Sequence, residues 1–182
     1  FVQIGVDNGS LPSGALNGLG NTQTDWQDEI FRNTFSQDHN ISVSGAAGIL
    51  PYRASFGFSG NQGVLRTSYN DRLTGSIALN PSFLDDQFKV ELNARGTQVD
   101  NRFADQGAIA TAINFDPTQS VMSDNEQFGG YTAWLDGDGN PIPIAPANPV
   151  ALIEQRRDES TVYRILGNVK LDRRPGGRVH QK

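Results

Sequence analysis

Five stretches of the sequence alternate apolar and polar residues with a period of two, the pattern of a β-strand with one apolar and one polar face. In the first stretch, residues 39–45, Ile41 and Val43 alternate with asparagine and serine. The other four cover residues 52–59, 73–80, 88–95 and 163–171, in the last of which Leu166 interrupts the polar side. The pattern predicts an all-β fold, an antiparallel meander of about five amphipathic strands.

Turn signals separate these strands. Residues 45–51 (GAAGILP) predict a hairpin between the first two strands, and residues 80–82 (NPS) predict a turn between the third and fourth. A further turn is expected between Val64 and Asn70, where the second strand gives way to the third.

Helical signals occur outside the strands. Thr24 and Gln27 have the spacing of a capping box, which predicts a short helix over residues 25–33 that buries Trp26, Ile30 and Phe31. About sixty residues separate the fourth and fifth strands, which is long for a loop without structure of its own. Apolar residues at helical spacing predict a helix within residues 103–114, and Asn148-Pro149 predicts the cap and first turn of another.

Composition excludes several classes of protein. Only 36% of the residues are hydrophobic, and no apolar run is long enough for a transmembrane helix. The absence of cysteine excludes disulfides and thiolate metal sites. A net charge of −5 without a basic cluster argues against nucleic acid as a partner.

No catalytic or metal-binding motif is visible. Residues 136–140 (DGDGN) open like a calcium loop, but Pro141 stands at the sixth position and Ala147 at the twelfth, so a simple turn is favoured. The two histidines have no carboxylates at ligand spacing. We therefore expect neither an enzyme nor a cofactor.

Seven phrases along the chain carry a family resemblance. They are residues 25–32 (DWQDEIFR), 39–45 (HNISVSG), 52–55 (YRAS), 80–83 (NPSF), 103–109 (FADQGAI), 115–119 (FDPTQ) and 148–155 (NPVALIEQ). In this order they resemble SusC/RagA-type TonB-linked outer-membrane transporters. The resemblance covers residues 21–171 and implies that the strands belong to a large transmembrane β-barrel with short helices in long extracellular loops.

The resemblance also implies a division of the chain. Residues 39–95 and 161–172 would be barrel strands, residues 1–38 an extracellular segment with a short helix, and residues 96–160 an extracellular insert. The basic residues 173–182 depart from the family pattern. Turns near Gly48 and Ser82 would be periplasmic. Apolar side chains would meet outer-membrane lipid, whereas Lys89, Glu91 and Arg95 would face a hydrated lumen.

The function implied is import across the Gram-negative outer membrane. The parent protein would take up oligosaccharides or peptides together with a SusD-like lipoprotein. TonB would act through an N-terminal region of the family that lies outside this sequence. The residues expected to contact ligand or partner from the extracellular loops are Trp26, Asp105, Gln106, Tyr131 and Trp134.

Other interpretations stay open. A soluble carbohydrate-binding β module could use Tyr131, Trp134 and the loop 136–140 as a sugar platform, and a surface adhesin fragment would bind a protein partner. A packing role in a short helix is favoured for Trp26 over ligand contact. For Tyr131 and Trp134, sealing a loop is as plausible as touching a ligand.

Overall fold

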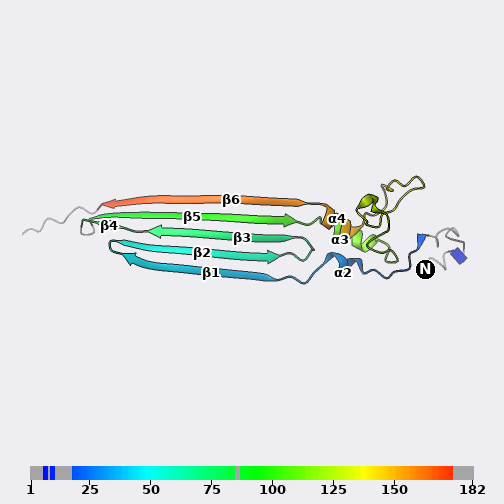
Figure 1. Ribbon diagram of the computed structural model, residues 1–182, viewed down its shortest axis with the longest axis horizontal. Helices are drawn as coiled ribbons and strands as arrows, with labels where there is room; N and C mark the ends of the chain where they lie inside the picture. The colour runs from blue at the N-terminus through cyan, green and yellow to red at the C-terminus, as the bar shows by residue number, and fades with distance from the viewer. Residues whose placement is uncertain (1–5, 8, 11–17, 85–86, 174–182) are drawn as a thin grey trace, which may run out of the picture. The chain divides into compact units, whose positions relative to one another are not determined.

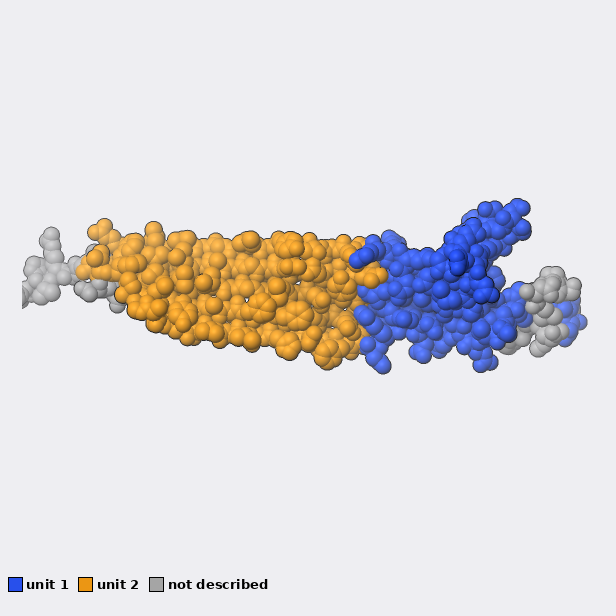
Figure 2. All heavy atoms as spheres, viewed as in Figure 1, with its two compact units in different colours: residues 1–33, 64–67, 104–157 blue, residues 34–63, 68–103, 158–182 orange. Residues whose placement is uncertain are grey.

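The computed structural model describes residues 6–7, 9–10, 18–84 and 87–173, and the chain divides into two compact units. The helical unit comprises residues 1–33, 64–67 and 104–157, and the sheet unit comprises residues 34–63, 68–103 and 158–182 (Figure 2). Each unit is thus assembled from segments that are far apart in the sequence.

The sheet unit is one antiparallel sheet of six strands (Figure 1). Its strands are β1 (Ser36–Ala47), β2 (Leu50–Gln62), β3 (Tyr69–Leu79), β4 (Ser82–Phe83), β5 (Phe88–Phe103) and β6 (Asp158–Arg173). The five long strands pair in chain order, β1-β2-β3-β5-β6, and β4 pairs with the start of β5. The predicted all-β antiparallel meander is confirmed.

The long strands extend beyond the ranges that the alternation predicts. β5 continues past residue 95 to Phe103, and β6 begins at Asp158. These two strands pair without a break from Phe88 opposite Arg173 to Phe103 opposite Asp158. Hydropathy marks a strand only where apolar residues occur, whereas backbone pairing continues through segments that are polar on both faces.

The two hairpin turns at the same end of the long strands differ in how well the sequence predicted them. The first is confirmed: Ala47 pairs with Leu50, and Gly48 adopts a φ of 61°, which glycine tolerates best. The turn predicted at residues 80–82 lies later in the chain: β4 continues the pairing there, and the chain reverses between Phe83 and Phe88, which pair with each other. Proline lacks an N–H, so it interrupts the strand without reversing the chain.

The cross-strand register places the apolar residues of all five long strands on one face. Antiparallel partners point to the same side, and Ile41 pairs with Phe56, Ala54 with Ile77 and Leu92 with Val169. We call this side the apolar face; its members are Ile41, Val43, Tyr52, Ala54, Phe56, Phe58, Leu73, Ile77, Leu79, Val90, Leu92, Ala94, Tyr163, Ile165, Val169 and Leu171.

The side chains of the apolar face are largely exposed. Ile165 is 85% exposed, Ile41 69% and Phe56 52%. Every buried apolar side chain in the described part of the chain belongs to the helical unit. The sheet therefore has no hydrophobic core of its own.

The helical unit contains α2 (Trp26–Ile30), α3 (Gly107–Asn114), the 3₁₀ turn η2 (Glu126–Phe128) and α4 (Pro149–Gln155). Its core consists of Trp26, Ile30, Ala108, Ala112, Phe115, Val150 and Ile153. No helix in the described ranges has the length and hydropathy of a membrane-spanning helix.

The ends of these helices refine the sequence predictions. The capping box is wrong: the N-cap of α2 is Asp25, whose carboxylate accepts from Gln27 N and Asp28 N, and the helix ends at Ile30. The Asn148-Pro149 start of α4 is confirmed, with the Asn148 side chain accepting from the second and third helical N–H groups. α3 begins at Gly107, inside the predicted range.

Residues 18–24 run beside residues 116–119. Thr22 N donates to Thr118 O at 3.1 Å, and Thr24 N donates to Pro117 O at 2.8 Å. Gly20 lies so close to the carbonyl of Thr118 that a Cβ on this residue would collide with that oxygen. This pairing joins the N-terminal segment to the long insert, a contact between residues almost one hundred positions apart that no local pattern predicts.

Candidate functional site

Trp26, one of the predicted contact residues, lies in the core of the helical unit. Its side chain is 3% exposed, and its ring meets the Phe115 ring edge-on with the centroids 4.6 Å apart. The indole Nε1 donates to Asp116 O at 3.0 Å, so the polar atom of the buried ring is satisfied. Trp26 thus fastens α2 to the end of α3; contact with a ligand or partner stays a prediction.

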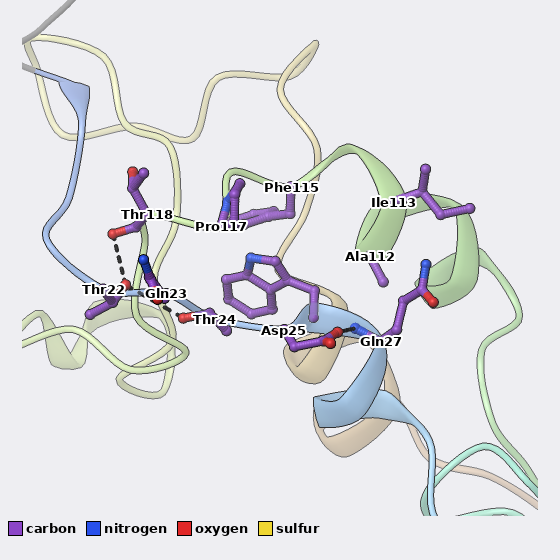
Figure 3. Close-up of a pocket in the computed structure, with 11 residues that line it drawn as sticks. Thr22, Gln23, Thr24, Asp25, Gln27, Ala112, Ile113, Phe115, Pro117 and Thr118 are labelled. Atoms are coloured by element: carbon purple, nitrogen blue, oxygen red, sulfur yellow. Dashed lines mark hydrogen bonds between the residues drawn. The ribbon is translucent and has the colours of Figure 1, made fainter. Parts of the chain in front are cut away.

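A surface hollow of about 720 Å³ lies beside Trp26 (Figure 3). It is lined by residues 22–27, Ala112, Ile113, Phe115, Pro117 and Thr118. Most of its polar groups are already used: the Asp25 carboxylate caps α2, and the hydroxyls of Thr22 and Thr24 donate to main-chain oxygens. Among the described residues of the lining, the side-chain amides of Gln23 and Gln27 remain for hydrogen bonds to a ligand.

A second pocket, of about 300 Å³, contains the predicted contact residues Tyr131 and Trp134. The Trp134 ring lies 5.8 Å from the Phe115 ring, which holds it against the core. Trp134 Nε1 and Thr132 Oγ1 are buried and have no hydrogen-bond partner within the described residues. Such orphaned buried groups are rare in folded proteins. Both atoms are closed off from solvent, so the surface that the pocket presents to a ligand is largely apolar.

Asn148 fixes the wall of this pocket. It is 5% exposed, and its amide nitrogen donates to Val121 O at 2.9 Å and Thr132 O at 3.2 Å. Its oxygen accepts from Val150 N and Ala151 N at the start of α4. One side chain therefore ties two loop segments to a helix end, which the capping motif in the sequence could not show.

Asp105 and Gln106, the remaining predicted contacts, precede α3. The Asp105 carboxylate accepts from Gly107 N at 2.8 Å and pairs with Arg156 at 2.7 Å. The hydrogen bond from Gly107 N, and after it the bond from Arg156, lower the pKa of Asp105 below its ordinary value. The Gln106 side chain is exposed. Their contact with a partner stays a prediction.

The loop at residues 136–140 forms a compact turn. The Asp136 carboxylate accepts from Asn140 N at 2.8 Å and Asp138 N at 3.0 Å, and the first of these bonds chiefly lowers its pKa. Within the described residues, no three His, Asp or Glu side chains are placed to hold a metal ion.

Lys89, Glu91 and Arg95 lie on the polar face of the sheet, opposite the apolar face. They occupy alternate positions of β5, so all three point to the same side. Glu91 accepts from Lys170 Nζ on β6 at 3.4 Å. Arg95 is placed between Ser76 and Leu166 in the register. Whether this side faces a lumen stays a prediction.

Residue-by-residue reasoning missed which polar residues come together across strands. The register brings Arg53, Arg72 and Arg164 to the same face as Arg95. Each sits at a polar position of its own strand, which the alternation does show. The sequence does not show the register, that is, which residue of one strand pairs with which residue of the next.

Two comparisons with known proteins bear on identity. No protein-family model matches the chain. The TonB-dependent receptor SusC of Bacteroides thetaiotaomicron is 39% identical to it over 167 residues. The match covers 85% of this chain and 17% of SusC, so the chain spans less than a fifth of the length of this relative.

The identity over most of the chain agrees with the resemblance carried by the seven phrases. The antiparallel sheet, with one apolar and one polar face, agrees with it as well. The chain therefore belongs to the SusC-like TonB-dependent receptors.

Proposed function

We propose that this chain forms part of the wall of a TonB-dependent importer in the Gram-negative outer membrane. The apolar face is the observation that carries the proposal. Five paired strands present their apolar side chains on one side, and no hydrophobic core exists beneath them in the described residues. A surface of this kind is stable against hydrocarbon and costly against water.

The dimensions of the apolar face fit a bilayer. Every long strand has at least 11 residues, and a tilted membrane strand needs about 9–11. Aromatic side chains lie at both ends of the apolar face. At one end, Phe58 and Tyr163 lie in the same row of cross-strand partners. At the other end, Phe83 pairs with Phe88. Aromatic girdles at both interfaces are typical of outer-membrane barrels.

The opposite face supports a hydrated lumen. Ser55 and Ser76 share a hydrogen bond of 2.7 Å, and Glu91 pairs with Lys170. In a closed barrel every backbone group is paired and these polar residues contact water. The proposed wall would then separate lipid from a solute path, and no catalytic step is part of this role.

The helical unit is the proposed extracellular part, where Trp26, Asp105, Gln106, Tyr131 and Trp134 lie in or beside its core and loops. The largely apolar pocket at Tyr131 and Trp134 is where we propose ligand or partner contact within this unit. The proposed partners are a SusD-like lipoprotein and TonB, and the proposed cargo is an oligosaccharide or peptide.

Import can be tested with the receptor that contains this chain. Cells with and without TonB would receive fluorescent maltooligosaccharides, oligogalacturonides or tripeptides in separate experiments. We expect TonB-dependent uptake of at least one of them, and co-purification of a lipoprotein with the tagged receptor. A receptor that is present in the outer membrane but supports no TonB-dependent uptake would contradict the importer. A folded, water-soluble protein that binds sugar through Trp134 would support the carbohydrate-binding module instead.

A further inference from the structure

Four arginines lie on the polar face of the sheet, one on each of four strands. They are Arg53 on β2, Arg72 on β3, Arg95 on β5 and Arg164 on β6. Cross-strand partners form rows that run across the sheet. On the polar face, four successive rows contain one arginine each, because the arginines occupy staggered positions on their strands. We call this set the arginine cluster.

The stagger brings neighbouring arginines within reach of one ligand, whereas Arg53 lies about 20 Å from both Arg72 and Arg164, so that the outer arginines would contact different units of an extended ligand. Arg164 pairs with Thr97, and Arg95 is two residues further along β5. Strand spacing and rise therefore put the Cα atoms of Arg95 and Arg164 about 8 Å apart, and those of Arg95 and Arg53 about 12 Å apart. Long arginine side chains easily span such gaps.

Three adjoining hollows surround the arginine cluster. Their volumes are about 390, 290 and 400 Å³, and Arg95 lines all three. Arg72 lines two of them, and Arg53 and Arg164 line one each. Arg95 is therefore common to the walls of all three hollows, which together have a mixed polar and apolar lining.

The arginine cluster has an excess of positive charge. None of its four guanidinium groups makes an ion pair or hydrogen bond within the described residues, although Lys170 on the same face is paired with Glu91. Asp38 is the single carboxylate among the described residues that line the three hollows. Unpaired guanidinium groups present donor forks that match carboxylate and sulfate oxygens.

The surroundings of the arginine cluster add a second requirement. Its hollows are bordered by hydroxyl and amide side chains, which are Asn40, Ser55, Ser59, Thr74, Ser76, Asn93, Thr97 and Asn168. Hydroxyl and amide groups both donate and accept hydrogen bonds, as sugar hydroxyls require of their partners. Apolar side chains, among them Val99, Val162 and Leu166, also line the hollows, but the hydroxyl and amide groups outnumber them on the polar face and so favour a sugar over a peptide.

We propose that the arginine cluster binds an anionic, hydroxyl-rich solute, an oligosaccharide that carries carboxylate or sulfate groups. The inference rests on the proposed function, because import makes this face a solute path. Arg95 contacts the anionic group from the centre, and the neighbouring arginines and hydroxyls hold adjacent sugar units. The arginine cluster thereby selects acidic over neutral sugars.

Calorimetric titration of the purified receptor in detergent tests this selection. The probes are trigalacturonate, a sulfated chondroitin disaccharide, neutral maltotriose and triaspartate. We expect an acidic sugar to bind at least tenfold more tightly than maltotriose, and its affinity to fall at least tenfold in Arg95→Gln. Arg95→Lys keeps the charge but loses the paired N–H donors of the guanidinium group, and should give an intermediate affinity.

Lys170→Gln is the matched control, because it removes one positive charge from the same face outside the arginine cluster. Equal losses in Lys170→Gln and Arg95→Gln would overturn the proposal, as would equal affinity for maltotriose and both acidic sugars. Tighter binding of triaspartate than of any sugar would overturn the choice of ligand. If Arg95→Gln fails to assemble, Arg72→Gln gives the same comparison. Binding is measured without TonB, so a failure of import would leave this result standing, and a failure of binding would leave import standing.

Discussion

A pair of neighbouring residues on β6 offers a direct test of which side of the sheet meets lipid. Ile165 and Leu166 point to opposite faces and are 85% and 59% exposed. The change is the same in both cases: Ile165→Lys and Leu166→Lys in the receptor that contains the chain. Size, charge and strand position are thereby matched, and only the face differs.

The expected cost of Ile165→Lys follows from its position. Within the apolar band, Ile165 lies two residues from Tyr163 at one end and six residues from Leu171 at the other, which is roughly 7 Å and 20 Å along the strand. A lysine there lies inside the band but nearer to one interface. On the lipid face of a barrel a lysine costs about 2–4 kcal/mol at the bilayer midplane and about 0–1 kcal/mol near an interface, so we expect a cost of about 1–2 kcal/mol.

The expected cost of Leu166→Lys is smaller. Leu166 is directly opposite Arg95, and a like-charge pair across strands costs roughly 0.2–1 kcal/mol. Water in the lumen screens that repulsion. The two variants should therefore differ by about 1 kcal/mol, or roughly fivefold in the ratio of folded to unfolded receptor.

The assay is urea unfolding of the receptor in lipid vesicles, followed by the mobility shift between folded and heat-denatured forms on gels. The amount of receptor in the outer membrane provides a second measurement. Equal destabilisation by the two lysines, or a larger effect of Leu166→Lys, would refute the assignment of the apolar face to lipid. Full folding of the Ile165→Lys protein in water would do so as well.

Three further predictions concern the helical unit. Gly20→Ala should loosen the pairing of the N-terminal segment with the insert, because the added methyl group meets a main-chain carbonyl. Gly18→Ala is the control and should be neutral, because no atom lies within 4 Å of the added methyl group. Limited proteolysis compares the two variants. Asn148→Ala should cost about 1–2 kcal/mol through the lost cap and more through the two released loop carbonyls, seen as a lower midpoint of unfolding for the helical unit. The ionised Asp105 should stabilise the unit fully at pH values above its ordinary pKa of 3.8, and this contribution should disappear as the pH falls through the lowered pKa of the folded state. Asp105→Asn should abolish this acid-dependent part of the stability. Unchanged acid sensitivity of the variant would contradict the role of the pair with Arg156.

The two proposals give the faces of the sheet separate roles. The apolar face would determine the surrounding medium, and the polar face would determine which solute is bound. A substitution on one face can therefore alter assembly without altering ligand choice, as the tests at Ile165 and Arg95 would show. Adjacent residues of one strand would then serve different functions, because side chains alternate between faces.

The strands and their two faces could be predicted from the sequence alone. Ile41, Phe56 and Ile165 were assigned to the apolar side by alternation within their own strands, and the register confirms that they share it. The direction of a side chain along a strand is a local property, since it depends only on whether the position is odd or even. The start of α4 was predictable for the same reason, because a cap involves residues two or three positions apart.

The tertiary structure alone decided how distant segments come together. Trp26 Nε1 bonds to Asp116, 90 positions away, and so joins the N-terminal segment and the insert in one core. The convergence of Arg53, Arg72, Arg95 and Arg164 likewise depends on how far each strand is shifted against the next. A shift between strands is set by turns and by pairing along the whole sheet, so no single strand contains that information.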